Sequence, residues 1–278
     1  IRGVGRNKGP ILRTRLRYNV GMRCGPRALL LFCLAGLGPL AGAQDSVGLP
    51  EIGLPQFIPG TIDARDVQVS PFGNRIALYD TSEINGVRML DADLNELWRV
   101  RLQAYWAGTW SGGNIIDFLP DGSAVLLPSV RTEGDVCLCN PDTGEAISYI
   151  DAVENRVYTL AASPDGKRIL TASNTEIVIW TRDGDDGAGA DANWRETLRV
   201  PNFEPSIHAA RFLPDGDHLA LATGASRDRE LVIYNVSGES LERVFGYGLS
   251  DGNISHQFYE ITVSPDGQWL ISAYRERL

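Results

Sequence analysis

The segment AASPDGKRILTAS, residues 161–173, contains a tetrapeptide, Ser163-Pro164-Asp165-Gly166, that returns in similar form along the chain. The other copies are Ser70-Pro71-Phe72-Gly73, Leu119-Pro120-Asp121-Gly122, Leu213-Pro214-Asp215-Gly216 and Ser264-Pro265-Asp266-Gly267. Measured between their prolines, successive copies lie 49, 44, 50 and 51 residues apart. The chain therefore contains an internal repeat.

Each copy has the composition of a tight turn. Proline presets φ at the first corner, aspartate can accept a hydrogen bond from a backbone N–H two residues on, and glycine tolerates positive φ. The flanking segments, such as residues 158–162 and 168–172, are short, apolar and partly alternating. This pattern predicts that each tetrapeptide joins two antiparallel strands.

Two more strands follow in each unit. The third is exemplified by residues 176–180 and 230–234, and the fourth by residues 97–101 and 195–199. Four short antiparallel strands that repeat in this way are typical of a β-propeller blade, because one small sheet cannot bury both of its faces and must stack on its neighbours.

The third unit also resembles known repeats. Val157, Leu160, the turn at 163–166, Ile169-Leu170 and the strand Ile177-Val178-Ile179-Trp180 follow a pattern similar to the WD-repeat and YVTN-type bacterial propeller families. The resemblance covers residues 61–278. It implies an all-β propeller of four-stranded antiparallel blades, about four and a half of them in this sequence, and it specifies the fold far more than the function.

One blade carries a second resemblance. Residues 90–98, LDADLNELW, are similar to the tryptophan-docking repeat of quinoprotein-type propellers, in which a tryptophan, here Trp98, closes one blade onto the next. That repeat carries glycine in its turn, where this sequence has Asn95. Because asparagine tolerates the left-handed conformation, we expect Asn95 to take the place of the glycine.

Residues 1–60 are expected to lie outside the blades. Residues 22–43 have a basic start, an apolar centre and a small-x-small sequence at Ala41-Gly42-Ala43, as in a secretory signal peptide. Residues 1–21 are expected to be upstream sequence translated from the wrong start or an extended basic region. Residues 44–60 form a lead-in rich in proline and glycine.

The other end of the sequence stops inside a repeat. The fifth unit has its turn and second strand before Leu278, but the sequence contains no segment for its third and fourth strands. Because propellers close a ring of about 4–8 blades, we expect the chain to be truncated from a ring of seven or eight blades.

Charge excludes two classes of partner. Residues 1–43 hold 8 of the 26 basic residues and none of the 35 acidic ones, so the remainder carries a net charge of −17. Such a surface repels nucleic acid and anionic lipid. It could attract a basic partner or divalent cations, but dispersed carboxylates that simply keep a β-rich protein soluble are the better explanation.

The signal peptide predicts an exported protein, periplasmic or extracellular. Its apolar run is too short to span a bilayer, so we expect no membrane span.

The most unusual loop lies between the first two blades. Tyr105, Trp106 and Trp110 stand among glycines at residues 104–113 and could form a partner- or ligand-binding surface on one rim of the ring. The alternative is that these aromatics pack between neighbouring sheets.

An acidic insertion interrupts the third blade. Asp183, Asp185 and Asp191 have some of the alternation of a calcium loop, but Glu196 falls one residue beyond the place where a closing bidentate glutamate would stand. A solvated loop is the simpler interpretation.

Groups for catalysis are few. The histidines, His208, His218 and His256, show no metal-ligand spacing, and neither a nucleophile elbow nor a phosphate loop is present. Cys137 and Cys139 would point to the same face of a strand; packing fits this geometry better than a strained disulfide. We therefore predict no catalytic residue, metal or cofactor.

These observations favour a non-catalytic exported propeller that binds a protein or peptide in the cell envelope. One alternative is a propeller enzyme of quinoprotein or lactonase type, with a carboxylate, arginine and histidine set on the ring axis. Another is an accessory propeller for outer-membrane assembly, against which the lack of a lipidation cysteine argues. The sequence does not indicate an oligomeric state.

Overall fold

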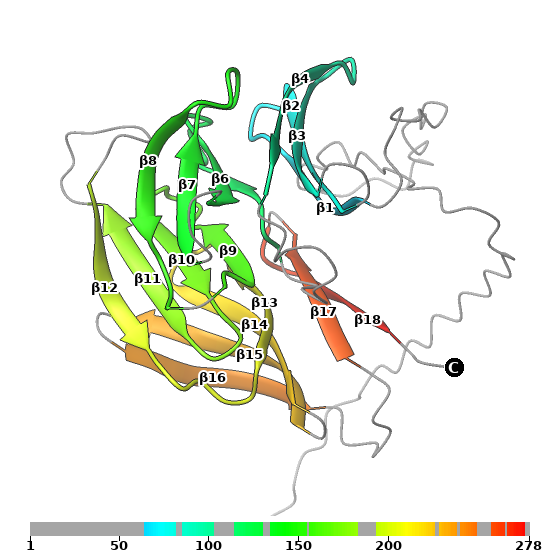
Figure 1. The fold of residues 1–278 in the computed structure, drawn as a ribbon. Helices are drawn as coiled ribbons and strands as arrows, with labels where there is room; N and C mark the ends of the chain where they lie inside the picture. The colour runs from blue at the N-terminus through cyan, green and yellow to red at the C-terminus, as the bar shows by residue number, and fades with distance from the viewer. Residues whose placement is uncertain are drawn as a thin grey trace, which may run out of the picture. The chain divides into compact units, whose positions relative to one another are not determined.

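The computed structural model describes residues 64–81, 85–102, 114–129, 134–154, 156–182, 193–225, 228–237, 240–248, 257–264 and 266–275. The regular elements in these ranges are all β-strands (Figure 1). The predicted signal peptide, the residues before it and the lead-in at 44–60 lie outside the described residues. In the described part of the chain, no helix has the length and apolar character needed to cross a membrane.

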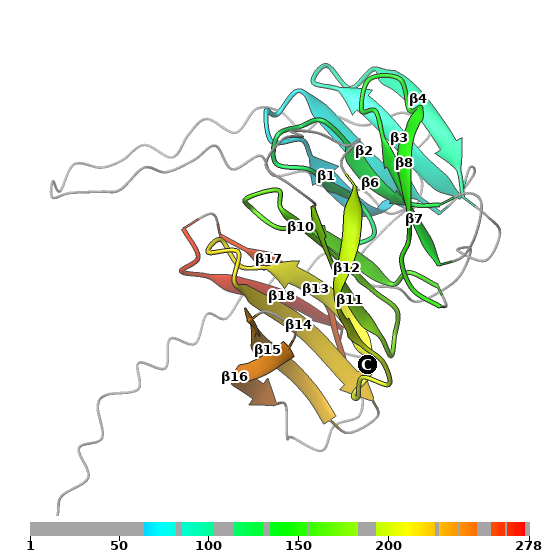
Figure 2. The ribbon, with the colours of Figure 1, turned by 90° about the vertical axis from the view of Figure 1, so that its left-hand side faces the viewer.

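The strands form five antiparallel sheets, one for each sequence unit, and every sheet follows chain order (Figure 2). The first blade comprises β1 (Ala64–Val69), β2 (Arg75–Asp80), β3 (Gly86–Asp91) and β4 (Glu96–Arg101). The second comprises β5 (Asp117–Phe118), β6 (Val125–Pro128), β7 (Asp135–Cys139) and β8 (Ala146–Asp151). The third comprises β9 (Thr159–Ala162), β10 (Arg168–Ala172), β11 (Ile177–Arg182) and β12 (Trp194–Val200). The fourth comprises β13 (Ile207–Phe212), β14 (His218–Ala225), β15 (Asp228–Ser237) and β16 (Ser240–Gly248). The fifth sheet pairs β17 (Gln257–Val263) with β18 (Leu270–Arg275).

The first strand of each blade contacts the first strand of the next. These contacts join β1 to β5, β5 to β9, β9 to β13 and β13 to β17. The first strands are therefore the inner strands, and β4, β8, β12 and β16 lie at the outer end of each sheet, as in a β-propeller. The predicted fold, with four four-stranded units and part of a fifth, is confirmed.

The hydrophobic core lies between the blades. One cluster joins residues of the first three blades, including Met89, Leu126 and Leu160, and a second joins the third and fourth blades around Leu170 and Leu221. Adjacent sheets thus bury their facing surfaces against each other, which is why a single blade would not be stable alone.

The repeated tetrapeptides are the predicted corners. Their glycines have φ between 69° and 76°. Asp121, Asp165, Asp215 and Asp266 each accept a hydrogen bond at 3.0 Å from the backbone N–H two residues on. The turn chemistry inferred from the sequence is confirmed in both respects.

The turn between β3 and β4 corrects one prediction. Leu94, and not Asn95, has the positive φ, at 66°. Asn95 instead donates its backbone and side-chain N–H groups to Asp91, at 2.8 and 3.0 Å. Leu94 packs against the cluster of Ile76, Leu78 and Leu90, and this contact offsets the strain of a left-handed leucine.

Candidate functional site

A polar cluster lies on the inner strands. When the five units are aligned on the turn proline, the residue three positions upstream is Gln68, Asp117, Ala161, Arg211 or Thr262. Four of these five residues are polar, although they occupy the innermost strand of each blade. We call Asp66, Gln68, Asn114, Asp117 and Arg211 the axial cluster, because their side chains bond to one another or to the next inner strand.

Asp66 connects the first blade to the second. Its side chain is 5% exposed, and Oδ2 accepts hydrogen bonds from the backbone N–H groups of Ile115 and Ile116 at 2.8 and 3.0 Å. Gln68 donates to Oδ1 at 2.9 Å. Burial raises the pKa of Asp66 above its usual range, although Arg211, Gln68 and the two backbone donors act in the opposite direction.

Asn114 is the centre of the cluster. With its amide oxygen facing Gln68 and Arg211, it accepts bonds from Gln68 Nε2 at 3.1 Å and from Arg211 Nε and Nη2 at 3.3 and 2.5 Å. Its backbone carbonyl also accepts a bond from Leu160 of the third blade at 2.8 Å. One buried asparagine therefore contacts three other blades.

Asp117 and Arg211 form an ion pair between the second and fourth blades. Arg211 Nη1 lies 2.8 Å from Asp117 Oδ2, and each side chain is 17% exposed. The same carboxylate oxygen accepts the backbone N–H of Ala162 at 3.0 Å. Thr159 repeats the arrangement one blade further on, where its hydroxyl accepts the N–H of Ala210 at 3.2 Å.

The axial cluster therefore fixes the inner strands to one another. It also supplies the carboxylates and the arginine that an enzyme on the ring axis would need. The two histidines among the described residues form their hydrogen bonds outside the axial cluster. His208 Nε2 lies 3.0 Å from the carbonyl oxygen of Gly224, and His218 Nδ1 lies 2.8 Å from Asp215 Oδ2.

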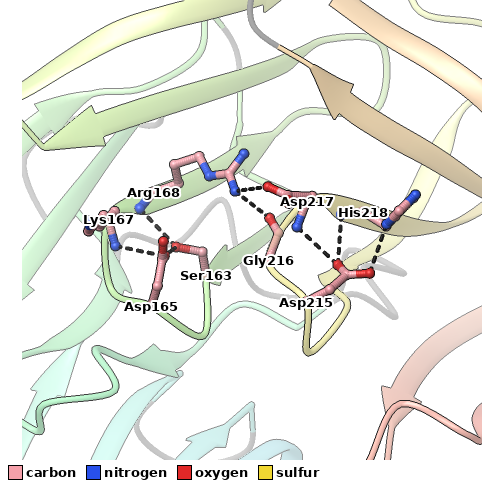
Figure 3. Close-up of polar contacts among 8 residues, drawn as sticks. All are labelled: Ser163, Asp165, Lys167, Arg168, Asp215, Gly216, Asp217 and His218. Atoms are coloured by element: carbon pink, nitrogen blue, oxygen red, sulfur yellow. Dashed lines mark hydrogen bonds and ion pairs between the residues drawn. The ribbon is translucent and has the colours of Figure 1, made fainter.

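A second set of polar contacts ties the turns together. In an antiparallel blade the first and third connections lie at the same end. We call this end of the blades the turn face; its described residues are 70–74, 92–95, 119–124, 140–145, 163–167, 213–217, 264 and 266–269. Figure 3 shows Arg168 of the third blade donating to Gly216 O at 2.6 Å and to Asp217 Oδ1 at 3.0 Å in the fourth blade. Arg75 makes a similar bridge to Asp142 at 2.6 Å.

Trp98 docks on the next blade, as its resemblance to the tryptophan-docking repeat implies. Its Nε1 donates to the carbonyl oxygen of Pro141 at 2.9 Å. The indole also covers Gly144, where an added Cβ would lie 2.8 Å from Cδ2 of Trp98. Gly144 also has a φ of 75°. Both the lack of space for a Cβ and the left-handed backbone therefore favour glycine at this position.

Three of the turn aspartates, Asp165, Asp215 and Asp266, have a lowered pKa. Hydrogen bonds from Ser264 and the backbone lower the pKa of Asp266. Burial opposes ionisation of Asp165 and Asp215, but hydrogen bonds from Ser163 and His218, respectively, outweigh it and lower the pKa of both carboxyls. The turn face is therefore lined with carboxylates at neutral pH.

Apolar side chains stand among these carboxylates. Phe72 is 71% exposed, Trp269 67% and Val69 46%, and all three lie in or beside a turn of the turn face. Phe72 occupies the position that aspartate has in the other four tetrapeptides. It makes no turn hydrogen bond through its side chain. Its ring lies over Gly122 in the turn of the second blade, where an added Cβ would lie 2.7 Å from Cε2 of Phe72, and the rest of the ring is open to solvent.

The residues of the predicted aromatic binding loop and of the calcium candidate lie outside the described residues. This holds for the binding residues Tyr105, Trp106 and Trp110, and also for Asp183, Asp185 and Asp191. Among the residues that the structure describes, no group of three or more His, Cys, Asp or Glu side chains could hold a metal ion.

The two cysteines of β7 lie inside the second blade. Cys137 and Cys139 are buried thiols outside any disulfide, with their sulfurs 2.7 Å apart. They belong to the core cluster of the first three blades, in line with the packing interpretation.

Sequence reasoning missed the axial cluster. The signal was available in the repeat itself, because polar residues recur three positions before the turn proline, where a strand covered on both sides would be apolar. Each turn is recognisable from its own four residues, whereas the polar positions of the preceding strand become apparent only when the five units are aligned.

Comparison with known proteins agrees with this architecture. Residues 146–181 match the family described as WD domain, G-beta repeat. The matched segment covers β8 and the first three strands of the third blade. Trp180, which ends the apolar part of β11, supplies the tryptophan of the Trp-Asp dipeptide typical of this repeat, and Thr181 replaces the aspartate.

Two solved propellers have a similar fold. Hydrazine synthase from Kuenenia stuttgartiensis matches with a TM-score of 0.57 at 16% identity, over 82% of this chain and 59% of that chain. The β-propeller domain of Cps50 (Swd1) from Myceliophteria thermophila matches with a TM-score of 0.52 at 16% identity, over 72% and 62% of the two chains. At this identity the likeness concerns the fold alone.

A sequence relative covers a smaller part. Protein hir1 of Emericella nidulans is 34% identical over 97 residues, which is 34% of this chain and 9% of that protein. The chain thus spans a small fraction of this relative and less than two thirds of the two propellers. The YVTN-type resemblance stays a prediction.

Proposed function

We propose that this WD-repeat β-propeller is a non-catalytic scaffold that binds a protein or peptide partner, and that it does so after export to the cell envelope. WD-repeat propellers offer a rigid surface for such interactions, and here the blades are held by the axial cluster and by the contacts of the turn face. A surface that does not deform can present its exposed side chains at little entropic cost.

The observation that carries the proposal is Phe72. Four turns use aspartate at this position to complete the turn, and the first turn exposes an aromatic ring instead. Exposed aromatic side chains are favoured anchors of protein interfaces. Asp121, in the turn that the ring covers, and the other carboxylates of the turn face would favour a partner with basic residues around an apolar centre.

The experiment uses Phe72→Asp, which gives the first turn the residue of the other four. We expect the melting temperature to change little, because the new carboxylate can bond the backbone N–H of Asn74 while the contact of the ring with Gly122 is lost. A photocrosslinker placed at position 72 should capture one defined partner, and Phe72→Asp should abolish co-purification of that partner.

The matched control is Val244→Asp, which removes another apolar side chain, 58% exposed, from an outer strand. We expect it to leave the partner bound. Loss of the partner in both variants, or in neither, would contradict the assignment of the turn face.

Export rests on residues 22–43 and on the net charge of −17 in the remainder. Mass spectrometry of the protein from fractionated cells should find the first residue at Gln44 and the protein outside the cytoplasm. A cytoplasmic protein that retains residues 22–43 would refute export while leaving the scaffold proposal intact. The two alternative functions, a propeller enzyme of quinoprotein or lactonase type and an accessory propeller for outer-membrane assembly, stay predictions.

A further inference from the structure

A cavity opens beside the axial cluster. Its volume is about 360 Å³, within the range of small-ligand sites. The lining residues come from four blades and are Gln68, Pro164, Arg211, Phe212, Pro214, Thr262, Val263 and Ser264. Three of them, Gln68, Arg211 and Thr262, occupy the position three residues before the turn proline, so the repeat itself brings them to one place.

The cavity has an apolar wall, to which Pro164, Phe212, Pro214 and Val263 contribute. The guanidinium carbon of Arg168 lies 5.7 Å from the centroid of the Phe212 ring and holds this ring in place. Such a contact is a cation–π interaction. The wall favours an apolar substituent, which gains free energy by leaving water.

The polar groups of the cavity offer both donors and an acceptor. Gln68 uses its two amide protons on Asp66 and Asn114, so its Oε1 is available to accept a bond. Arg211 uses three of its five N–H groups on Asn114 and Asp117, and one proton on each terminal nitrogen is left. A ligand group that accepts from arginine and donates to glutamine would satisfy both residues.

Charge excludes an anion as the preferred ligand. The guanidinium of Arg211 is already paired with Asp117, and Asp66 lies close enough to interact with it electrostatically. The turn carboxylates of Asp165, Asp215 and Asp266 add further negative potential. A carboxylate would therefore gain little from Arg211 and would be repelled by its surroundings.

We propose that this axial cavity is a binding site for a neutral carboxamide group carried on a small apolar substituent. The carbonyl oxygen accepts from Arg211, the amide N–H donates to Gln68, and the apolar substituent packs on Phe212 and the two prolines. The site does not depend on Phe72 or on a protein partner, so it stands independently of the scaffold proposal.

The test compares three probes of nearly equal size at pH 7: N-acetyl-leucinamide, which is neutral, N-acetyl-leucine, which is an anion, and leucinamide, which is largely a cation. Two-dimensional NMR of the isotopically labelled full chain follows each titration. For a ligand of this size we expect a dissociation constant on the order of 1 mM for the neutral probe, and binding at least about tenfold weaker for the anion. Tighter binding of either charged probe, or no binding of the neutral one, would overturn the proposal.

A cavity-filling variant locates the site. Thr262 lines the cavity and is exposed. Thr262→Phe should therefore block the neutral probe while the melting temperature stays within about 2 °C. Gln268→Phe, in the turn after the same strand but outside the cavity lining, is the control and should bind as the unmodified chain does. Undiminished binding by Thr262→Phe would refute the location. The three-probe comparison needs no variant, so it decides the proposal even if this variant does not fold.

Discussion

The inner and outer strands of the blades reverse the usual relation between polarity and burial. On the inner side, Asp66 is 5% exposed and Thr159 is fully buried, although both are polar. On the outer strands, Leu97, Ile147 and Val244 are 41%, 39% and 58% exposed, although all are apolar. Distance from the propeller axis therefore does not predict which residue types are buried.

Hydrogen bonds between blades explain the buried polar residues, and β-bulges explain the exposed apolar ones. Each of these buried polar side chains of the inner strands accepts a backbone N–H of the next blade, so its burial is compensated by a hydrogen bond. Each of these exposed apolar residues of the outer strands lies where the strand register shifts, next to the pairs Leu90–Glu96, Cys139–Ala146 and Tyr234–Arg243. Such bulges keep an edge strand from pairing with another chain.

The largest effect is expected at Asp66. Asp66→Ala leaves two backbone N–H groups and the amide of Gln68 without their acceptor in a buried place, and it should lower the free energy of unfolding by about 3–5 kcal/mol. Urea denaturation followed by circular dichroism measures this loss. Asp66→Asn keeps one acceptor and avoids a buried charge, so its loss should be about half as large; equal losses would show that hydrogen bonding is not the cause.

The next effect is expected at the junction of the first and second blades. Trp98→Ala removes the indole from Gly144 and its hydrogen bond to Pro141, with a loss of about 2–3 kcal/mol for a half-buried tryptophan. Trp98→Phe keeps a ring and loses the N–H, so the loss should be about 1 kcal/mol. If thermal unfolding is unchanged in Trp98→Ala, Trp98 does not dock the blades.

A smaller effect, dependent on pH, is expected at Asp165. Because its pKa is lowered in the folded state, the ionised form favours folding. This stability is present in full above the ordinary pKa of about 3.9 and is lost as the pH falls below it. Asp165→Asn should cost about 0.5 kcal/mol at pH 7, the low end for a hydrogen bond since the residue is exposed. The two proteins should become equally stable near pH 2, and a difference that is the same at both pH values would exclude a role for the charge.

The smallest effect is expected on the outer strands. Val244 and Phe245 are apolar side chains that are 58% and 53% exposed. Val244→Thr and Phe245→Ser should each change the free energy of unfolding by no more than about 0.5 kcal/mol, as is usual for surface substitutions. Equilibrium unfolding of both variants beside Asp66→Ala tests the comparison directly. A loss above about 2 kcal/mol, which is typical of buried positions, would mean that β16 is covered in solution.

The sequence predicted the repeat, the corners and the strand count, because each depends on local chemistry: proline and glycine fix backbone angles wherever they stand. It also predicted the docking of Trp98, through resemblance. It did not predict the left-handed Leu94, because packing on Ile76 and Leu78 outweighed the local preference of Asn95. It did not predict the pairing of Asp117 with Arg211, since their separation of 94 residues gives no indication that the second and fourth blades meet.

The central claim is that polar residues of the inner strands hold the blades together. A double-mutant cycle with Asp117→Ala, Arg211→Ala and the double variant, measured by urea unfolding at pH 7, tests it most directly. The ion pair is 2.8 Å long and each side chain is 17% exposed. We therefore predict a coupling free energy of at least about 1 kcal/mol. A coupling indistinguishable from zero would contradict the account.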